Sequence, residues 1–323
     1  MTENKKLDLD MLIRDAGSIG ICAHVRPDGD AVGSCLGMYL FIKKWYPDRQ
    51  VRVYLEKPGD IFLFLKGADE ISGDPNEDIR FDLFMALDCS DLQRLGDFGT
   101  YFKRAKKTVC IDHHVTNPAY ADENCILADA SSTSEIVCDL IGTDRIDHDM
   151  AEALYTGIAH DTGVFQYSCT SSHTMNLAGR LMDKGINFTR IITETFFERT
   201  YLQQQILGRT LLESVRVLDG RVIFSALKRK DMDFFNAKTS DLEGLSAALR
   251  NTAGVEVSIF IHESRPGEWK VSLRSGEKVD VAAVAAHFDG GGHVRAAGCT
   301  MHGDAHDVIN NLTELIALQL GEE

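Results

Sequence analysis

The segment SIGICAHVRPDGDAVGS, residues 18–34, decides the fold predicted for the first half of the chain. It opens with an apolar run of strand length, turns through a polar stretch that contains Pro27 and Gly29, and continues into a helical pattern. Similar apolar runs alternate with helical stretches up to about residue 165. This alternation predicts an α/β domain in which a parallel sheet carries helices on both faces.

The elements expected in this first half follow from the same patterns. Strands are expected at residues 19–25, 51–55, 81–87, 108–111 and 125–127, and helices near residues 31–44, 134–141, 150–163 and 171–185. Ligands of such sheets bind at the carboxyl ends of the strands. The polar residues that follow these strands are therefore the first candidates for a functional site.

The second half of the chain has a different pattern. Residues 188–214 contain few helix breakers and predict one long helix that links two domains. After it, Asp219 and Gly220 join two β-rich runs in a hairpin, and strands at 255–264 and 269–275 and helices at 279–288 and 305–320 follow. We expect a smaller α/β domain here, with boundaries at 1–186 for the first domain, 187–215 for the linker helix and 216–323 for the second domain.

The composition is that of a globular protein in a reducing compartment. Hydrophobic residues make up 44% and charged residues 26% of the 323 residues, which is sufficient for two cores. The eight cysteines contain no C-x-x-C pair, and no apolar run approaches the roughly 18 residues of a membrane span. We therefore expect a cytoplasmic protein without a membrane partner. Its net charge of −15 disfavours long nucleic acids, so any nucleic-acid ligand should be short.

The densest chemical signal lies between the first strand and the first helix. His24, Asp28 and Asp30 fall within seven residues, and Pro27 and Gly29 prevent the segment from continuing as strand or helix. The loop can therefore turn the three side chains toward one point and bind a metal ion. A turn with solvated carboxylates is the alternative, since such sequences are common in loops.

A second signal is Asp112-His113-His114, which follows the fourth predicted strand. One imidazole can coordinate a metal while the next faces a substrate phosphate, and the neighbouring carboxylate can orient a ring. Exposed surface histidines are the alternative. Asp88 ends an apolar strand and Asp161 ends a helical run, where a helix cap or turn residue would also be ordinary.

Taken together, these residues indicate a metal site more strongly than each does alone, because a carboxylate at the end of a central strand can bridge two cations. Two cations about 3.5–4 Å apart can activate water and stabilise charge on a phosphoryl group. Oxygen-rich ligands with one imidazole per metal favour manganese or magnesium over zinc, and the imidazoles favour manganese. The expected cofactors are two divalent metal ions, with Mn²⁺ preferred and Mg²⁺ also accepted.

A third signal lies in the second half, in the run Gly290-Gly291-Gly292-His293-Val-Arg295. Consecutive glycines expose backbone N–H groups, and a histidine and an arginine beside them add side-chain donors for phosphate. A plain glycine-rich connection is the alternative. Arg274, at the end of a predicted strand, is a further candidate phosphate or base contact, although a solvated arginine would look the same.

Five motifs occur in a fixed order, HVRPDGDAVGS, LDCSD, CIDHHVTN, GIAHDTGVFQY and GGGHVRAAG. From about residue 10 to the C-terminus the sequence resembles the DHH/DHHA1 phosphoesterase superfamily, in particular its NrnA-type branch of nanoRNases and pAp phosphatases. The resemblance implies a parallel-sheet DHH catalytic domain, a linker helix and a DHHA1 substrate-binding domain. Family members often form homodimers, so a homodimer is a further expectation.

The resemblance also implies roles for individual residues. His24, Asp28 and Asp88 would hold one metal ion, and Asp30, Asp88, His113 and Asp161 would hold the other. Asp88 would bridge the two ions, Asp112 would support the catalytic site, and His114 would face the scissile phosphate. In the second domain Arg274, Gly291, Gly292, His293 and Arg295 would bind the remainder of the substrate across a cleft between the domains. Ser132, Thr133 and Glu135 would line this cleft, although an N-terminal helix cap would account for Ser132 or Thr133 almost as well.

The expected activity is hydrolysis of RNA of about two to five nucleotides to mononucleotides, with pAp converted to AMP as a further reaction. A phosphodiesterase acting on cyclic di-AMP or its linear product pApA is the main alternative. A manganese inorganic pyrophosphatase would share the N-terminal motifs but not GGGHVRAAG. A nucleotide sensor without catalysis is a fourth possibility, which metal-dependent turnover of any substrate would exclude.

Overall fold

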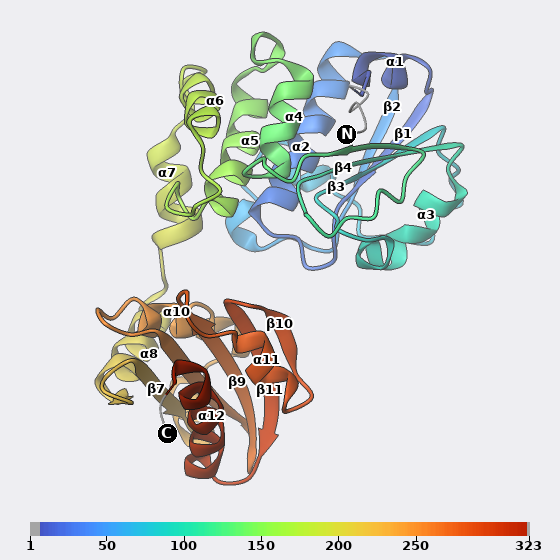
Figure 1. The fold of residues 1–323 in the computed structure, drawn as a ribbon. Coiled ribbons are helices and arrows are strands. Elements are labelled where there is room, and N and C mark those ends of the chain that lie inside the picture. Colours follow the sequence, from blue (N-terminus) through green and yellow to red (C-terminus); the bar gives the residue numbers. More distant parts are fainter. Residues whose placement is uncertain (1–6, 322–323) are drawn as a thin grey trace. The chain divides into compact units, whose positions relative to one another are not determined.

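The computed structural model describes residues 7–321, which form two units divided between Glu198 and Arg199 (Figure 1). Each unit has a β-sheet and hydrophobic clusters of its own. The expected fold class, α/β with a parallel sheet in the first half and a smaller mixed domain after it, is confirmed. Within residues 7–321 no helix combines the length and apolarity that crossing a membrane requires.

The first unit is built on a five-stranded parallel sheet with the strand order β2-β1-β3-β4-β5. Its strands are β1 (Ser18–Cys22), β2 (Gln50–Tyr54), β3 (Leu83–Leu87), β4 (Lys107–Asp112) and β5 (Glu123–Ile126). All five expected strands are present, and their ends differ from the expected ones by up to three residues. The sheet accordingly brings the polar segments after β1, β3 and β4 to one edge.

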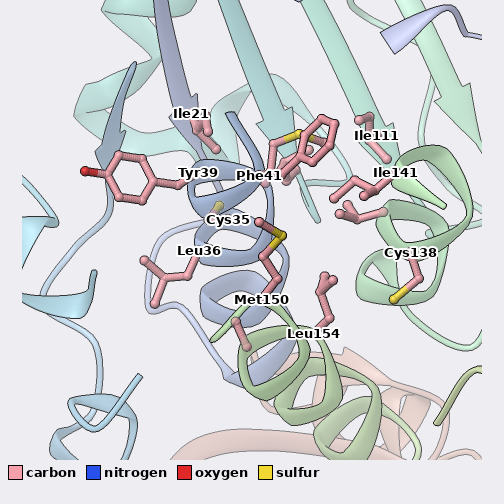
Figure 2. Close-up of a cluster of buried hydrophobic side chains, with 14 of the residues drawn as sticks. Ile21, Cys35, Leu36, Tyr39, Phe41, Ile111, Cys138, Ile141, Met150 and Leu154 are labelled. Atoms are coloured by element: carbon pink, nitrogen blue, oxygen red, sulfur yellow. The ribbon is translucent and has the colours of Figure 1, made fainter. Parts of the chain in front are cut away.

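Helices cover both faces of this sheet. They are α1 (Leu9–Arg14), α2 (Gly29–Trp45), α3 (Gly99–Arg104), α4 (Thr133–Ile141), α5 (His148–Asp161), α6 (Ser172–Met182) and α7 (Phe188–Ile192). Figure 2 shows side chains of α2, α4 and α5 packed together against Ile21 of β1 and Ile111 of β4. On the opposite face Tyr101 and Phe102 of α3 join an aromatic cluster with Tyr54 and Phe84.

Close packing of α2 on α5 depends on glycine. A Cβ atom at Gly33 would lie 2.4 Å from the carbonyl oxygen of Ala153, and one at Gly37 would lie 2.6 Å from the Leu154 side chain. A Cβ at Gly157 of α5 would lie 2.7 Å from an Asp30 carboxylate oxygen. The glycines therefore let the two helix backbones approach, which places the start of α2 near the end of α5.

The expected single helix over residues 188–214 is wrong. Helix α7 ends at Ile192, a π-helical turn spans Thr193–Phe197, and a separate helix α8 (Tyr201–Leu212) follows. The backbone is extended at Glu198, and Thr200 starts α8 with a capping box in which its hydroxyl and the Gln203 side chain bind each other's backbone amides. Because a capping box begins a new helix, a segment without proline or glycine can still contain two separate helices.

The second unit has a six-stranded sheet with the order β10-β11-β9-β8-β7-β6, antiparallel except between β7 and β8. Its strands are β6 (Val215–Val217), β7 (Val222–Leu227), β8 (Val257–Arg265), β9 (Glu268–Ser275), β10 (Gly291–His293) and β11 (Ala296–His302). Its further helices are α9 (Arg229–Phe235), α10 (Leu245–Arg250), α11 (Val281–Ala286) and α12 (Ala305–Leu320). The hairpin expected at Asp219-Gly220 is present between β6 and β7.

The glycine-rich run after α11, for which an anion-binding segment or a plain connection was expected, is in large part a strand. Gly291, Gly292 and His293 form strand β10, which pairs with β11. A Cβ at Gly290 would lie 2.4 Å from the Gly298 carbonyl oxygen, and one at Gly292 would lie 2.5 Å from that of Ala296. The glycines thus allow a tight strand pair, a requirement that is independent of any anion.

Candidate metal centre

The carboxyl edge of the first sheet gathers the polar side chains that the sequence singled out. His24 follows β1, Asp88 follows β3, and His113 and His114 follow β4. Helix α2 begins at Gly29, so Asp28 is its N-cap residue and Asp30 lies in its first turn, and Asp161 is the last residue of α5. Together with Asp112, the last residue of β4, these seven residues converge at this edge.

One group of donors comprises His24, Asp28 and Asp88. The Nε2 atom of His24 lies 3.6 Å from an Asp28 carboxylate oxygen and 3.5 Å from one of Asp88. The Nδ1–H of the same ring donates to the carbonyl oxygen of Val25 at 2.9 Å, which leaves Nε2 directed at the carboxylates. The other Asp28 oxygen accepts from the backbone amides of Asp30 and Ala31 as the helix cap.

A second group comprises Asp30, His113 and Asp161, whose donor atoms lie within 4.8 Å of one another. His113 Nε2 is 3.0 Å from an Asp161 oxygen and 3.6 Å from the Asp88 oxygen that does not face His24. The two carboxylate oxygens of Asp88 therefore face different groups. Asp88 has a left-handed backbone conformation, with φ of 50°, at the sharp turn after β3.

Helix α4 fixes two of these carboxylates from behind. The backbone amides of Thr133 and Ser134 donate to the two oxygens of Asp30 at 2.6 and 2.9 Å, and the Thr133 hydroxyl donates to Asp88 at 3.2 Å. These amides are in the first turn of α4, where backbone donors have no partner within the helix. The N-terminus of α4 thus holds Asp30 and Asp88 at fixed positions.

Asp112 is fully buried and orients His114. It accepts a hydrogen bond from His114 Nδ1 at 2.7 Å and another from the Asn117 side chain at 2.6 Å. Burial raises the Asp112 pKa, but the bonds from His114 and Asn117 outweigh it and lower the pKa below its ordinary value. His114 Nδ1 also lies 3.7 Å from Asp88, so Asp88, His113 and His114 form a third group of possible metal ligands, in which Asp112 competes for the His114 nitrogen.

The clustered carboxylates shift the pKa values of their neighbours in the direction that adds positive charge or removes negative charge. Burial and the charges of Asp88 and Asp161 raise the Asp30 pKa well above its ordinary value. Burial alone would lower the pKa of His24 and His113, but neighbouring carboxylates raise both to about 10. The carboxylates around each imidazole thus favour its positively charged form.

The donor set fits divalent cations. Its carboxylates are joined by one imidazole in the two groups described above and by two imidazoles in a third group, Asp88-His113-His114. None of the groups contains a thiolate, a composition that suits Mn²⁺ or Mg²⁺. Asp88 carries one oxygen toward each group, so it has the geometry to serve two ions. His24 and Asp28 would bind on one side of it, and Asp30, His113 and Asp161 on the other.

The five candidates in the second unit lie together around the β9–β11–β10 strands. Arg274, Ala296 and His293 are directly opposite one another on neighbouring strands, so their side chains share one face of the sheet. Arg295 is exposed and donates to the carbonyl oxygens of Val279 and Glu277 at 2.9 and 2.7 Å. His293 is also exposed. A phosphate-binding role for these residues stays a prediction.

Two contributions to the first site were missed or only partly anticipated. Thr133 was expected as a helix cap or cleft residue, whereas it bonds directly to Asp30 and Asp88. Asn117 was given no role in the site, although it holds Asp112 and also donates to the Cys89 carbonyl oxygen. Glu135 turns instead to the hydroxyls of Ser131 and Thr174. The only sequence signal for Asn117 was a polar side chain close behind two histidines.

Two family models match this chain in the order that the motifs predicted. The DHH family N-terminal domain matches residues 18–158, which include most of the clustered ligands. The DHHA1 domain matches residues 219–321.

The chain belongs to the DHH/DHHA1 phosphoesterase superfamily.

Curated relatives within this superfamily extend over most of the chain. A protein of Thermus thermophilus named bifunctional oligoribonuclease and PAP phosphatase NrnA is 29% identical over 304 residues, covering 93% of this chain and 89% of the relative. The Bacillus subtilis protein of the same name is 26% identical and covers 86% of this chain and 88% of the relative. The resemblance inferred from the motifs is thereby confirmed.

A solved structure supports the same assignment for this DHH/DHHA1 chain. An exopolyphosphatase-related protein from Bacteroides fragilis is 26% identical, superposes with a TM-score of 0.86, and covers 96% of each chain. Both DHH and DHHA1 parts are therefore represented in a crystal structure of similar fold.

Proposed function

We propose that this chain is a Mn²⁺-dependent phosphoesterase that hydrolyses RNA of about two to five nucleotides to mononucleotides and also converts pAp to AMP. The observation that carries the proposal is that Asp88 directs one carboxylate oxygen at His24 and the other at His113, with further carboxylates beside each of these imidazoles. The names of the Thermus and Bacillus relatives supply the substrate class. The net charge of −15 is in keeping with short substrates, because it offers little attraction to a long strand.

In this proposal the two cations supply an activated water and neutralise charge on the phosphoryl oxygens. The protein's part is to fix the ligands in advance. The α4 amides hold Asp30, the Val25 carbonyl oxygen holds the His24 ring, and Asp112 holds His114 with its free nitrogen available to a substrate phosphate. Preorganised donors of this kind lower the barrier because they need not reorient during the reaction.

The second unit would bind the rest of the substrate. His293 of β10 and Arg274 of β9 lie on one face of their sheet, and Ala296 of the intervening strand β11 lies between them. Both can donate to phosphate, and an arginine can also stack on a base. Gly291 and Gly292 would bring backbone amides to the same ligand, whereas Arg295 would act mainly by holding the Glu277–Val279 carbonyl groups.

The test is a panel of substrates at equal concentration with Mn²⁺: labelled RNA dimer, RNA 20-mer, pAp, pApA and cyclic di-AMP. We expect the RNA dimer and pAp to be turned over and the 20-mer to be cleaved far more slowly. A repeat with Mg²⁺ should give lower rates than Mn²⁺. Preference for cyclic di-AMP or pApA over the RNA dimer and pAp would favour the signalling phosphodiesterase instead.

A further inference from the structure

The π-helical turn Thr193–Phe197 is the last regular element of the first unit. Glu198, directly after it, is the last residue of this unit. π-helical turns are rare, and they occur frequently at functional sites. The turn also makes several specific contacts with a residue beside the metal centre, His160.

His160 is hydrogen-bonded to the turn through Thr195. The Thr195 hydroxyl donates to the Ile191 carbonyl oxygen at 2.7 Å, so it accepts from His160 Nε2, which lies 2.8 Å away. The His160 ring also makes edge-to-face contacts with Phe62, at 5.1 Å between ring centres, and with Phe196 of the turn, at 5.8 Å. These contacts fix the ring in one orientation.

The fixed ring packs against the start of helix α2, which supplies two candidate ligands. A Cβ atom at Gly29 would lie 2.3 Å from Cγ of His160, so the ring is in close contact with the Gly29 backbone. Gly29 separates Asp28 from Asp30, and His160 itself precedes Asp161. The segment with Asp28 and Asp30 and the segment with Asp161 therefore meet at His160. A displacement of the π-turn would shift the candidate ligands of both segments.

We propose that His160 is a positioning residue that holds the Asp28–Asp30 loop and Asp161 in register, and that its bond to Thr195 couples the metal centre to the segment leading into the second unit. The inference rests on the metal centre of the proposed function and extends it. By thermodynamic reciprocity, if the π-turn strengthens metal binding, metal binding must stabilise the π-turn.

The test compares Thr195→Val, which keeps the side-chain shape but removes the hydroxyl, with Thr195→Ser, which keeps the hydroxyl. Mn²⁺ affinity of the metal-free full chain is measured by isothermal titration calorimetry, and the melting temperature is measured in EDTA. We expect about tenfold weaker Mn²⁺ binding for Thr195→Val, the size of effect seen when a metal site loses an outer support, and no more than about a twofold change for Thr195→Ser. Wild-type affinity in Thr195→Val would overturn the coupling, even if its melting temperature fell.

A second measurement needs no variant. Amide hydrogen exchange of residues 193–198 is followed in the wild-type chain with and without Mn²⁺, and we expect the metal to slow exchange there. Unchanged exchange in a chain that binds Mn²⁺ would overturn the coupling while leaving the proposed function intact. Absence of any Mn²⁺ binding by the wild-type chain would overturn both.

Discussion

Asp88 is the residue on which the candidate centre depends, because each of its carboxylate oxygens faces a different donor group. It is almost fully buried, and its left-handed backbone at the end of β3 is a conformation that few non-glycine residues adopt. Such backbone geometry is retained where the surrounding structure enforces it. The turn after β3 therefore serves the site rather than the stability of the strand.

We expect Asp88→Ala to abolish hydrolysis of the RNA dimer, by at least about 1,000-fold, because loss of a ligand shared by two ions removes several kcal/mol of charge stabilisation. The variant should remain folded, since removing a charge from a crowded carboxylate cluster relieves repulsion. Circular dichroism and steady-state rates with Mn²⁺ check both points. Asp48→Ala, at an exposed position, is the control. Retained activity in Asp88→Ala would refute the shared-ligand arrangement.

A second prediction concerns the other unit. His293→Ala should raise the KM for the RNA dimer by about tenfold, because it removes one phosphate donor, and should leave Mn²⁺ affinity unchanged. Kinetics and metal titration are compared with those of His302→Ala, an exposed histidine at the end of β11. Equal losses of metal and substrate binding would contradict a division of labour between the units.

The sequence allowed the clustered residues to be predicted because each stands directly after an apolar strand or at a helix end. The sequence could not indicate the residues that hold these side chains in place. Thr133 acts through its backbone amide as well as its hydroxyl, and a backbone contact leaves no trace in residue type. His160 looked like an unremarkable helical residue, and its importance depends on contacts with Gly29 and Thr195, which are far away in the chain.

At the scale of elements, the packing of α2 on α5 sets the spacing of ligands that the two helices carry. Gly33→Ala would place a methyl group 2.4 Å from the Ala153 carbonyl oxygen, which is backbone and cannot move aside independently. We expect the free energy of unfolding to fall by about 2 kcal/mol, as for other overpacked interiors, and Mn²⁺ affinity to fall with it. Urea denaturation and metal titration measure the two effects.

The control for this substitution is Gly179→Ala in α6, where a Cβ atom would have no neighbour within 4 Å. There alanine should stabilise the chain by up to about 1 kcal/mol, because it favours the helix. Equal effects of the two substitutions would mean that the close contact of α2 with α5 does not limit the site.

Asp82, at the amino end of β3, leads to a prediction about how the stability of the chain depends on pH. Asp82 accepts hydrogen bonds from the Gly17 and Ser18 amides and pairs with Lys106 at 2.6 Å, and the bond to Lys106 is the main reason that its pKa falls to about 2. A depressed carboxyl pKa contributes stability above the unfolded value of 3.8, and this is lost as pH falls toward 2. Asp82→Asn should therefore cost about 1 kcal/mol at pH 7 and almost nothing near pH 2. Denaturant unfolding at both pH values provides the comparison, and a constant difference would contradict the assignment.

The elements also show where sequence patterns succeed and fail. The inner strands β1, β3 and β4 were predictable because buried parallel strands are continuous apolar runs with polar ends. Strand β10 was not, because its glycines resemble a loop and only its partner β11 makes it a strand. The break between α7 and α8 carries a recognisable capping box at Thr200 and Gln203, but without a proline or glycine it was overlooked.

At the scale of the whole molecule, the two units have separate cores and all candidate metal ligands lie in the first. We expect calorimetry to resolve two unfolding transitions, of which Mn²⁺ raises only one. A ligand at 100 times its Kd stabilises the state that binds it by about 2.7 kcal/mol. In Asp88→Ala the Mn²⁺-dependent shift should disappear. A shift of both transitions together would show that the units unfold cooperatively.

The first unit ends before Arg199, and its ligands extend from His24 only to Asp161. A chain made from its N-terminus completes this unit while the second is still untranslated, and domains generally fold in that order during synthesis. A nascent polypeptide on the ribosome can consequently bring together all of its candidate metal ligands before the residues proposed to bind substrate have been added.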